Sequence, residues 1–221
     1  MSDRDRLSRR DVLRLSGVGS LLWAAGRTPT AAQTMRRTPT QVLGPFYPVV
    51  KPLDQDADLT VIARRPGRAA GQVVEVMGRI MNRERKPVVG ARVEIWQANT
   101  HGRYTHPSDR NPAPLDPNFE GFAVLKTDAE GRYRFKTIKP GAYPEDSGAM
   151  RAPHIHFEVL GRTNRLVTQM YFAGEPLNDT DRFLATAAGN RERLIVPFRP
   201  SPEPEADGLL VGVWDIVLDQ G

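Results

Sequence analysis

The fold is constrained most by a series of short segments, β-branched or alternating between apolar and polar residues, with turn-forming residues between them. Such segments are typical of strands that bury one face. The expected strands are Val73–Met81, Ala91–Gln97, Phe122–Thr127, Arg132–Ile138, His154–Leu160, Leu166–Phe172, Arg193–Pro197 and Leu209–Leu218. Turns at Asp128–Gly131 and Arg85–Gly90 separate neighbouring strands. One short helix is expected, capped by Asn178 or Asp179 and ending near Ala188.

Short strands with a single minor helix predict a mostly β protein, either a two-sheet β-sandwich or a related barrel, rather than a parallel α/β sheet. The chain has 221 residues, of which 39% are hydrophobic, and this suits one core. We assign the sandwich to residues 71–221. Residues 33–70 are proline-rich and contain GPFYP at 44–48, so we expect an extended N-terminal arm packed on the sandwich.

The first 32 residues resemble a twin-arginine signal peptide. Arg9 and Arg10 form the arginine pair, a weakly apolar stretch follows at Ser16–Ala25, and small residues near Ala31 offer a cleavage site. This pattern predicts export of the folded chain to the periplasm or beyond, whereas the alternative is a disordered basic arm. The apolar stretch is too short to span a bilayer. Because there is no cysteine, a lipoprotein anchor is excluded as well.

The charge of the chain gives no indication of a nucleic-acid partner. The formal charge is +5, and it falls to about +2 when residues 1–32 are removed, since that segment holds a surplus of arginine. No run of lysine and arginine and no basic stripe interleaved with aromatics occurs in the rest. The absence of cysteine also means that any metal must be held by nitrogen and oxygen donors.

Three pieces of the sequence, PVVGARVEIW, TDAEGRYRF and IKPGAY, resemble the prealbumin-like β-sandwich modules that serve as non-catalytic appendages. In an exported binding module of this kind, Tyr143 would be a buried packing residue whose hydroxyl bonds to the backbone. The sequence up to Tyr143 leaves this alternative open.

The segment APHIHF carries the first sign of a metal site. His154 and His156 are two residues apart on an expected strand, so both imidazoles project from the same face. Ile155, Phe157 and Val159 alternate with them and supply the apolar face for the core. A histidine pair at this spacing indicates either a metal site or a structural role.

Three sets of additional ligands could in principle complete a site with this pair. A cupin-like iron site needs a glutamate four or five residues after the second histidine, where Leu160 and Gly161 stand, so this scheme fails. A two-histidine, one-carboxylate iron(II) site would use Glu158, in an unusual arrangement along one strand. A zinc site would recruit His101 or His106 from a polar loop.

A fourth scheme comes from a resemblance. The segments WQANTHGRYTHPSD, DPNFEGF, TDAEGRYRF, IKPGAYP, RAPHIHF and TQMYF occur in this order, and together they resemble the intradiol ring-cleaving dioxygenases between Gly44 and Phe172. The resemblance implies an iron(III) site whose ligands are Tyr104, Tyr143, His154 and His156. A phenol is a poor ligand until a strongly Lewis-acidic cation removes its proton, and iron(III) is such a cation.

The same resemblance implies an activity and further site residues. It implies cleavage of a catechol-type ring by dioxygen to a muconate-type diacid, with Tyr143 also accepting a substrate proton. Arg151 matches a pocket arginine that stabilises negative charge, and Gln169, Trp96 and Tyr47 match residues around the substrate. The chain carries every expected ligand itself, which suits an exported single-domain member and is compatible with a homo-oligomer. Glu145 stands where protocatechuate-type members place a tryptophan, so the identity of the catechol stays open.

Overall fold

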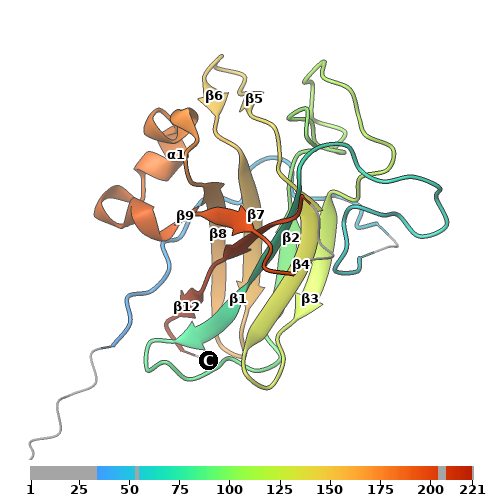
Figure 1. The fold of residues 1–221 in the computed structure, drawn as a ribbon. Helices are drawn as coiled ribbons and strands as arrows, with labels where there is room; N and C mark the ends of the chain where they lie inside the picture. Colours follow the sequence, from blue (N-terminus) through green and yellow to red (C-terminus); the bar gives the residue numbers. More distant parts are fainter. Residues whose placement is uncertain (1–33, 53–54, 204–207, 221) are drawn as a thin grey trace, which may run out of the picture. The chain divides into compact units, whose positions relative to one another are not determined.

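The computed structural model describes residues 34–52, 55–203 and 208–220. The strands are β1 (Val73–Asn82), β2 (Arg92–Trp96), β3 (Phe122–Lys126), β4 (Arg132–Ile138), β5 (Tyr143–Pro144), β6 (Met150–Arg151), β7 (His154–Leu160), β8 (Arg165–Phe172), β9 (Ile195–Val196), β10 (Phe198–Pro200), β11 (Leu210–Val213) and β12 (Ile216–Leu218). One sheet has the order β10-β11-β1-β12, with β4 paired to the other edge of β1, and the second has the order β3-β2-β7-β8-β9. The prediction of a mostly β, two-sheet sandwich is therefore confirmed (Figure 1).

The core lies between the two sheets and follows from the alternation of each strand. Val74 and Val76 of β1 face Ile155 and Phe157 of β7, and each of these side chains is at most 1% exposed. A second apolar cluster of Trp96, Ala98, Tyr104, Phe122 and Tyr143 lies apart from this core. The inward face expected for Ile155, Phe157 and Val159 is thus confirmed, and the opposite face of β7 is buried as well.

Two of the expected strands differ from the structure. The segment Leu209–Leu218 forms two strands, β11 and β12, both parallel to β1. The break occurs because the carbonyl of Trp214 turns towards Gly78, where a Cβ atom would lie only 1.9 Å from that oxygen, and Asp215 instead accepts the backbone N–H of Arg79 at 2.9 Å. The expected strand Arg193–Pro197 is shorter, since a 3₁₀ helix extends to Arg193.

The helical region also needs correction, because the expected single helix is three short pieces. These are a 3₁₀ helix at Pro176–Asp179, the α-helix α1 at Arg182–Ala185 and a second 3₁₀ helix at Ala188–Arg193. The N-cap of α1 is Asp181, which accepts from the backbone N–H groups of Phe183 and Leu184, rather than Asn178 or Asp179. Figure 1 shows α1 near the β5–β6 hairpin, at one end of the sandwich.

Part of the segment before β1 lies against β8 of the second sheet. The backbone N–H of Gln41 donates to Val167, and the Thr168 hydroxyl donates to the carbonyl of Pro39 at 2.8 Å. The predicted signal peptide, residues 1–32, lies outside the described residues. Within the described ranges, no helix is long and apolar enough to cross a membrane.

Candidate metal centre

Strand β7 places both histidines on the face turned away from the sandwich core. The Nε2 atoms of His154 and His156 are 3.2 Å apart. The Nδ1 atom of His154 lies 2.6 Å from the carbonyl oxygen of Ala152, so this nitrogen carries the proton and donates it. The lone pair of His154 Nε2 is therefore directed towards the space that His156 also faces.

The two tyrosines lie on separate segments of the chain, and a shared hydrogen-bond acceptor holds these segments together. The carbonyl of Asn99 accepts the N–H groups of Gly102 and Gly141, at 3.0 and 2.9 Å. A Cβ atom on Gly102 would lie 2.2 Å from the carbonyl oxygen of Ala142, so glycine is required for this approach. As a result Tyr104 and Tyr143 meet with ring centroids 5.5 Å apart and planes at 88°.

The four predicted ligands meet in one buried place. The hydroxyl of Tyr143 lies 3.4 Å from His154 Nε2, and the ring centroids of Tyr104 and His156 are 6.3 Å apart. All four residues are between 2% and 6% exposed. Burial raises the pKa of both phenols and lowers the pKa of both imidazoles well below its usual value. Without a cation, all four side chains are therefore neutral at pH 7.

The chemistry of this donor set fits a metal ion. The hydroxyl of Tyr104 is buried and has no hydrogen-bond partner among the described residues. Buried polar atoms are rarely left in this way unless a ligand or water satisfies them. Nitrogens in neighbouring coordination positions, each about 2 Å from a metal, are separated by about 3 Å, which matches the spacing of the two Nε2 atoms.

The alternative ligands considered from the sequence are not brought to the histidine pair. Glu158 forms an ion pair with Arg165, and His106 accepts the N–H of Ser108 at 3.1 Å. His101 is exposed. No cluster of three histidine, aspartate or glutamate side chains suited to a metal occurs among the described residues. The carboxylate scheme and the zinc scheme therefore lack their ligands here.

Arg151 lies beside this centre in a buried polar network. Its Nη1 atom is 3.5 Å from the Tyr143 hydroxyl, and its Nη2 atom donates to Gln169 at 2.7 Å. Burial lowers the pKa of Arg151, but the adjacent Tyr143 and Tyr171 phenols and the Asp181 carboxylate raise it more, so the net shift is upward. Gln169 in turn donates to the carbonyl of Val42 at 2.9 Å.

Two members of this network were not singled out from the sequence. One is Tyr171, whose hydroxyl donates to Gln169 at 2.8 Å. Asp181 was not considered, although it is 1% exposed and accepts from Arg151. An aspartate directly before the apolar run of a short helix is an N-cap signal, and this signal could have identified it. The β5–β6 hairpin, which carries Tyr143 and Arg151, is too short to give a periodic pattern.

Trp96 and Tyr47 lie on one side of the histidines. The indole of Trp96 stacks on the His156 ring, with centroids 4.8 Å apart and planes at 10°. The ring of Tyr47 packs edge-on against Trp96 at 5.0 Å, while its hydroxyl donates to the buried carboxylate of Glu94. Tyr47 thus supports the centre through Trp96, and its hydroxyl is directed elsewhere.

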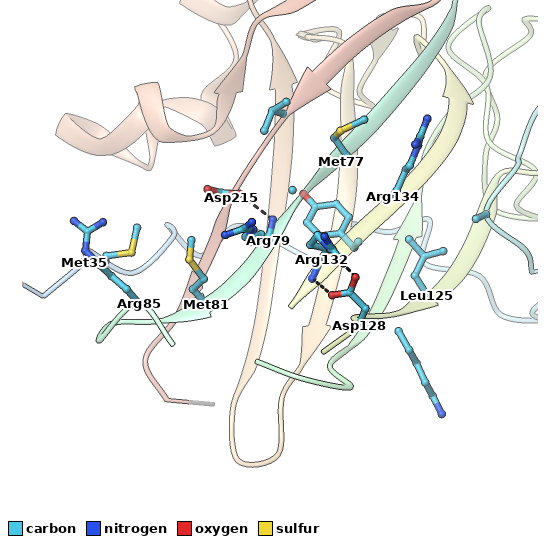
Figure 2. A pocket seen from close by; sticks show the side chains of 15 residues that line it. Met35, Met77, Arg79, Met81, Arg85, Leu125, Asp128, Arg132, Arg134 and Asp215 are labelled. Atoms are coloured by element: carbon cyan, nitrogen blue, oxygen red, sulfur yellow. Dashed lines mark hydrogen bonds and ion pairs between the residues drawn. The ribbon is translucent and has the colours of Figure 1, made fainter. Parts of the chain in front are cut away.

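A cavity of about 140 Å³ adjoins Tyr104 and Trp96 and is also lined by Phe46 and Phe122. Lys51, Gln97 and Glu120 also line this cavity, whereas Tyr143, His154 and His156 do not. A larger groove of about 940 Å³ lies on the other sheet, over β1 and β4. Figure 2 shows methionines and arginines around this groove, and none of the four predicted ligands lines it.

Comparison with known proteins identifies the family. A family model described as "Dioxygenase" matches residues 42–220, and the chain is 44% identical over 209 residues to the protocatechuate 3,4-dioxygenase beta chain of Burkholderia cepacia. The chain belongs to the intradiol ring-cleavage dioxygenase family. The match to the beta chain covers 86% of this chain and 87% of that relative. The resemblance noted in the sequence is therefore confirmed.

Other intradiol dioxygenases are similar over a smaller part of their own length. The chain is 34% identical to catechol 1,2-dioxygenase 1 of Acinetobacter lwoffii, over 78% of this chain but only 57% of that enzyme. Among solved structures, the dioxygenase domain of a dioxygenase–carbohydrate-binding fusion from Streptomyces sp. SirexAA-E is 29% identical, with a TM-score of 0.63. That match covers 84% of this chain and 100% of that domain.

Proposed function

We propose that this chain is an iron(III)-dependent intradiol dioxygenase that cleaves a catechol-type ring with dioxygen to give a muconate-type diacid. The observation that carries the proposal is the convergence of two phenols and two imidazoles in one buried place, with the hydroxyl of Tyr104 left without a partner in the described part of the chain. Family membership supports the same reaction class.

Tyr104, Tyr143, His154 and His156 would hold the iron. When bound, iron(III) supplies the Lewis acidity that removes protons from phenol and diol oxygens. Burial raises the pKa of both tyrosines, so only a strongly Lewis-acidic cation would convert them to phenolates. Two phenolates also offset most of its charge of +3, which makes a buried position tolerable.

The residues of the chain have separate roles in this scheme. The Oη atom of Tyr143 is the proton acceptor for one hydroxyl of the diol. The guanidinium of Arg151 is held beside this oxygen, so it stabilises the negative charge that develops there or on the substrate. The stacked indole of Trp96 fixes the orientation of His156.

One comparison bears on the substrate. The identity of 44% to a protocatechuate 3,4-dioxygenase beta chain makes protocatechuate the first compound to test. An oxygen-electrode panel of protocatechuate, catechol, hydroxyquinol and bulkier diols would rank the substrates.

The proposal is tested by a visible spectrum combined with oxygen consumption. Purified wild-type protein should contain about one iron per chain and be red to brown through phenolate-to-iron charge transfer. Tyr143→Phe and His156→Ala should lose this colour and the activity. Tyr133→Phe is the matched control, because Tyr133 is a buried tyrosine whose hydroxyl donates to the carbonyl of Trp214. A colourless protein without iron that consumes no oxygen with any diol would instead favour the non-catalytic binding module.

We also propose that residues 1–32 direct export by the twin-arginine route. The paired Arg9 and Arg10 before an apolar stretch support this proposal. A chain with both arginines replaced by lysine should stay in the cytoplasm and keep residues 1–32 attached. Export of that variant at the wild-type level, measured by fractionation, would contradict the proposal.

A further inference from the structure

One buried carboxylate, that of Asp181, connects the helical region to the candidate centre. Its Oδ1 atom accepts the N–H groups of Phe183 and Leu184 at 3.0 and 2.9 Å, which caps α1. Its Oδ2 atom accepts Nε of Arg151 at 2.8 Å and the N–H of Ala152 at 3.0 Å. The two oxygens therefore have different tasks, since only Oδ1 is needed for the cap.

The Oδ2 contact fixes how Arg151 faces the site. The guanidinium is a rigid planar fork, so holding two of its corners places the third. Nε is held by Asp181, and Nη2 by Gln169 at 2.7 Å and Tyr171 at 3.2 Å. The remaining corner, Nη1, lies 3.5 Å from the hydroxyl of Tyr143.

The same oxygen also reaches the histidine pair through one residue, Ala152. Ala152 donates its N–H to Asp181, while its carbonyl accepts Nδ1–H of His154 at 2.6 Å. The carboxylate thus fixes the residue that orients the His154 ring and selects its tautomer. Groups that orient a metal-binding histidine in this way tune the site without touching the metal.

We propose that Asp181 is a positioning residue of the ring-cleaving site: it holds Nη1 of Arg151 at the Tyr143 oxygen and, through Ala152, directs Nε2 of His154 to the metal. This inference rests on the proposed function. Asp181 and Arg151 are also a buried ion pair, with side chains 0% and 4% exposed, so solvent cannot replace either partner.

The competing explanation is that Asp181 only caps a helix, and two substitutions separate the roles. Asparagine and serine cap helices about as well as aspartate. In Asp181→Asn the side-chain oxygen can keep the cap, but the amide NH₂ then faces Arg151 and Ala152, which are both donors. Asp181→Ser keeps a cap oxygen and leaves the Oδ2 position empty. If capping were its only role, both variants would behave as wild type.

The experiment uses the iron-loaded full chain and measures iron content, visible spectrum, kcat and KM. Asp181→Asn and Asp181→Ser should bind iron but show a shifted charge-transfer band, and kcat should fall about 10- to 100-fold with little change in KM. Asp179→Asn is the control, because the Asp179 side chain is 83% exposed and forms an ion pair with Arg191. It should behave as wild type.

A double-mutant cycle then shows whether Asp181 acts through Arg151. On an Arg151→Met background, adding Asp181→Asn should lower kcat by much less than it does alone, and the double variant should be no less heat-stable than either single variant. Equal losses on both backgrounds would contradict the inference. So would wild-type kcat and an unshifted band in the folded single variants. A wild-type protein without iron or activity would instead contradict the proposed function.

Discussion

At the scale of single residues, two buried tyrosines differ in whether their hydroxyls have a hydrogen-bond partner. The hydroxyl of Tyr133 donates to the carbonyl of Trp214 at 2.7 Å, and burial raises its pKa well above the usual value. The hydroxyl of Tyr104 is equally buried, but it has no hydrogen-bond partner among the described residues. A buried polar group in that condition lowers stability, so its presence indicates a binding role.

Exchanging each tyrosine for phenylalanine should give opposite results. In metal-free protein, Tyr104→Phe should leave the free energy of unfolding unchanged within about 0.5 kcal/mol or raise it, because no hydrogen bond is lost. Tyr133→Phe should lower it by about 1 to 3 kcal/mol, since the carbonyl of Trp214 loses its donor. Urea titrations measure these changes. Iron content should fall in Tyr104→Phe and stay at the wild-type level in Tyr133→Phe. A large destabilisation of metal-free Tyr104→Phe would give its hydroxyl a structural role.

The histidine pair predicts a pH dependence for the metal-free protein. Burial lowers the pKa of His154 and His156 well below 6.5, so the folded chain keeps both neutral while the unfolded chain protonates them. The unfolded state thus binds more protons, and the free energy of unfolding falls as pH drops below about 6.5. The slope from the pair approaches about 2.7 kcal/mol per pH unit. A double His154→Gln, His156→Gln variant should lack this part of the slope between pH 7.5 and 5.5. Identical slopes, measured with a chelator present, would show that the imidazoles are hydrated in the folded state.

At the scale of elements, the site depends on two loops that pack backbone against backbone. Gly102 has a φ of +80°, and a Cβ atom there would lie 2.2 Å from the Ala142 carbonyl oxygen. Gly148 has nearly the same φ, +82°, but open space where its Cβ would be. Comparing Gly102 with Gly148 therefore distinguishes the cost of a left-handed backbone from the cost of the close contact between the loops.

Alanine at these two glycines should have unequal effects. Gly148→Ala should cost about 1 kcal/mol from the left-handed conformation alone. Gly102→Ala should cost clearly more, and it should reduce iron binding because the segment that carries Tyr104 must move away from Tyr143. Heat denaturation and iron content measure both effects. Equal melting temperatures and equal iron content would show that the loops can separate without disturbing the site.

The elements with a regular pattern could be predicted, and the irregular ones could not. Strand β4 has the bounds expected from its alternation, and β7 carries its histidines on the expected face. The β5–β6 hairpin pairs only two residues on each strand, so it leaves no periodic pattern in the sequence. The break between β11 and β12 depends on the contact of Trp214 with Gly78, which lies far away in the sequence. Such breaks follow from tertiary contacts and not from local preference.

At the scale of the whole molecule, the predicted ligands could be named from the sequence because a family pattern places them. The residues that orient these ligands could not be named in this way. Tyr104 comes from a loop, Tyr143 from β5 and the histidines from β7, and only the folded sandwich brings these segments together. The role of Asp181 depends on a helix packing beside β6, a contact that no spacing in the sequence predicts. Residues that touch the reacting groups leave a motif, whereas those that orient them are found by geometry.

Because the predicted ligands come from separate segments, iron binding should stabilise the entire sandwich. A ligand that binds only the folded state adds about 2.7 kcal/mol when its concentration is 100 times Kd. For a chain of this length, that gain raises the melting temperature by about 5 to 10 °C. Calorimetry of the wild type with iron and after chelation should show this shift, whereas His156→Gln should melt at the same temperature in both conditions. An unchanged melting temperature of wild type at saturating iron would mean that the four side chains do not bind the metal together.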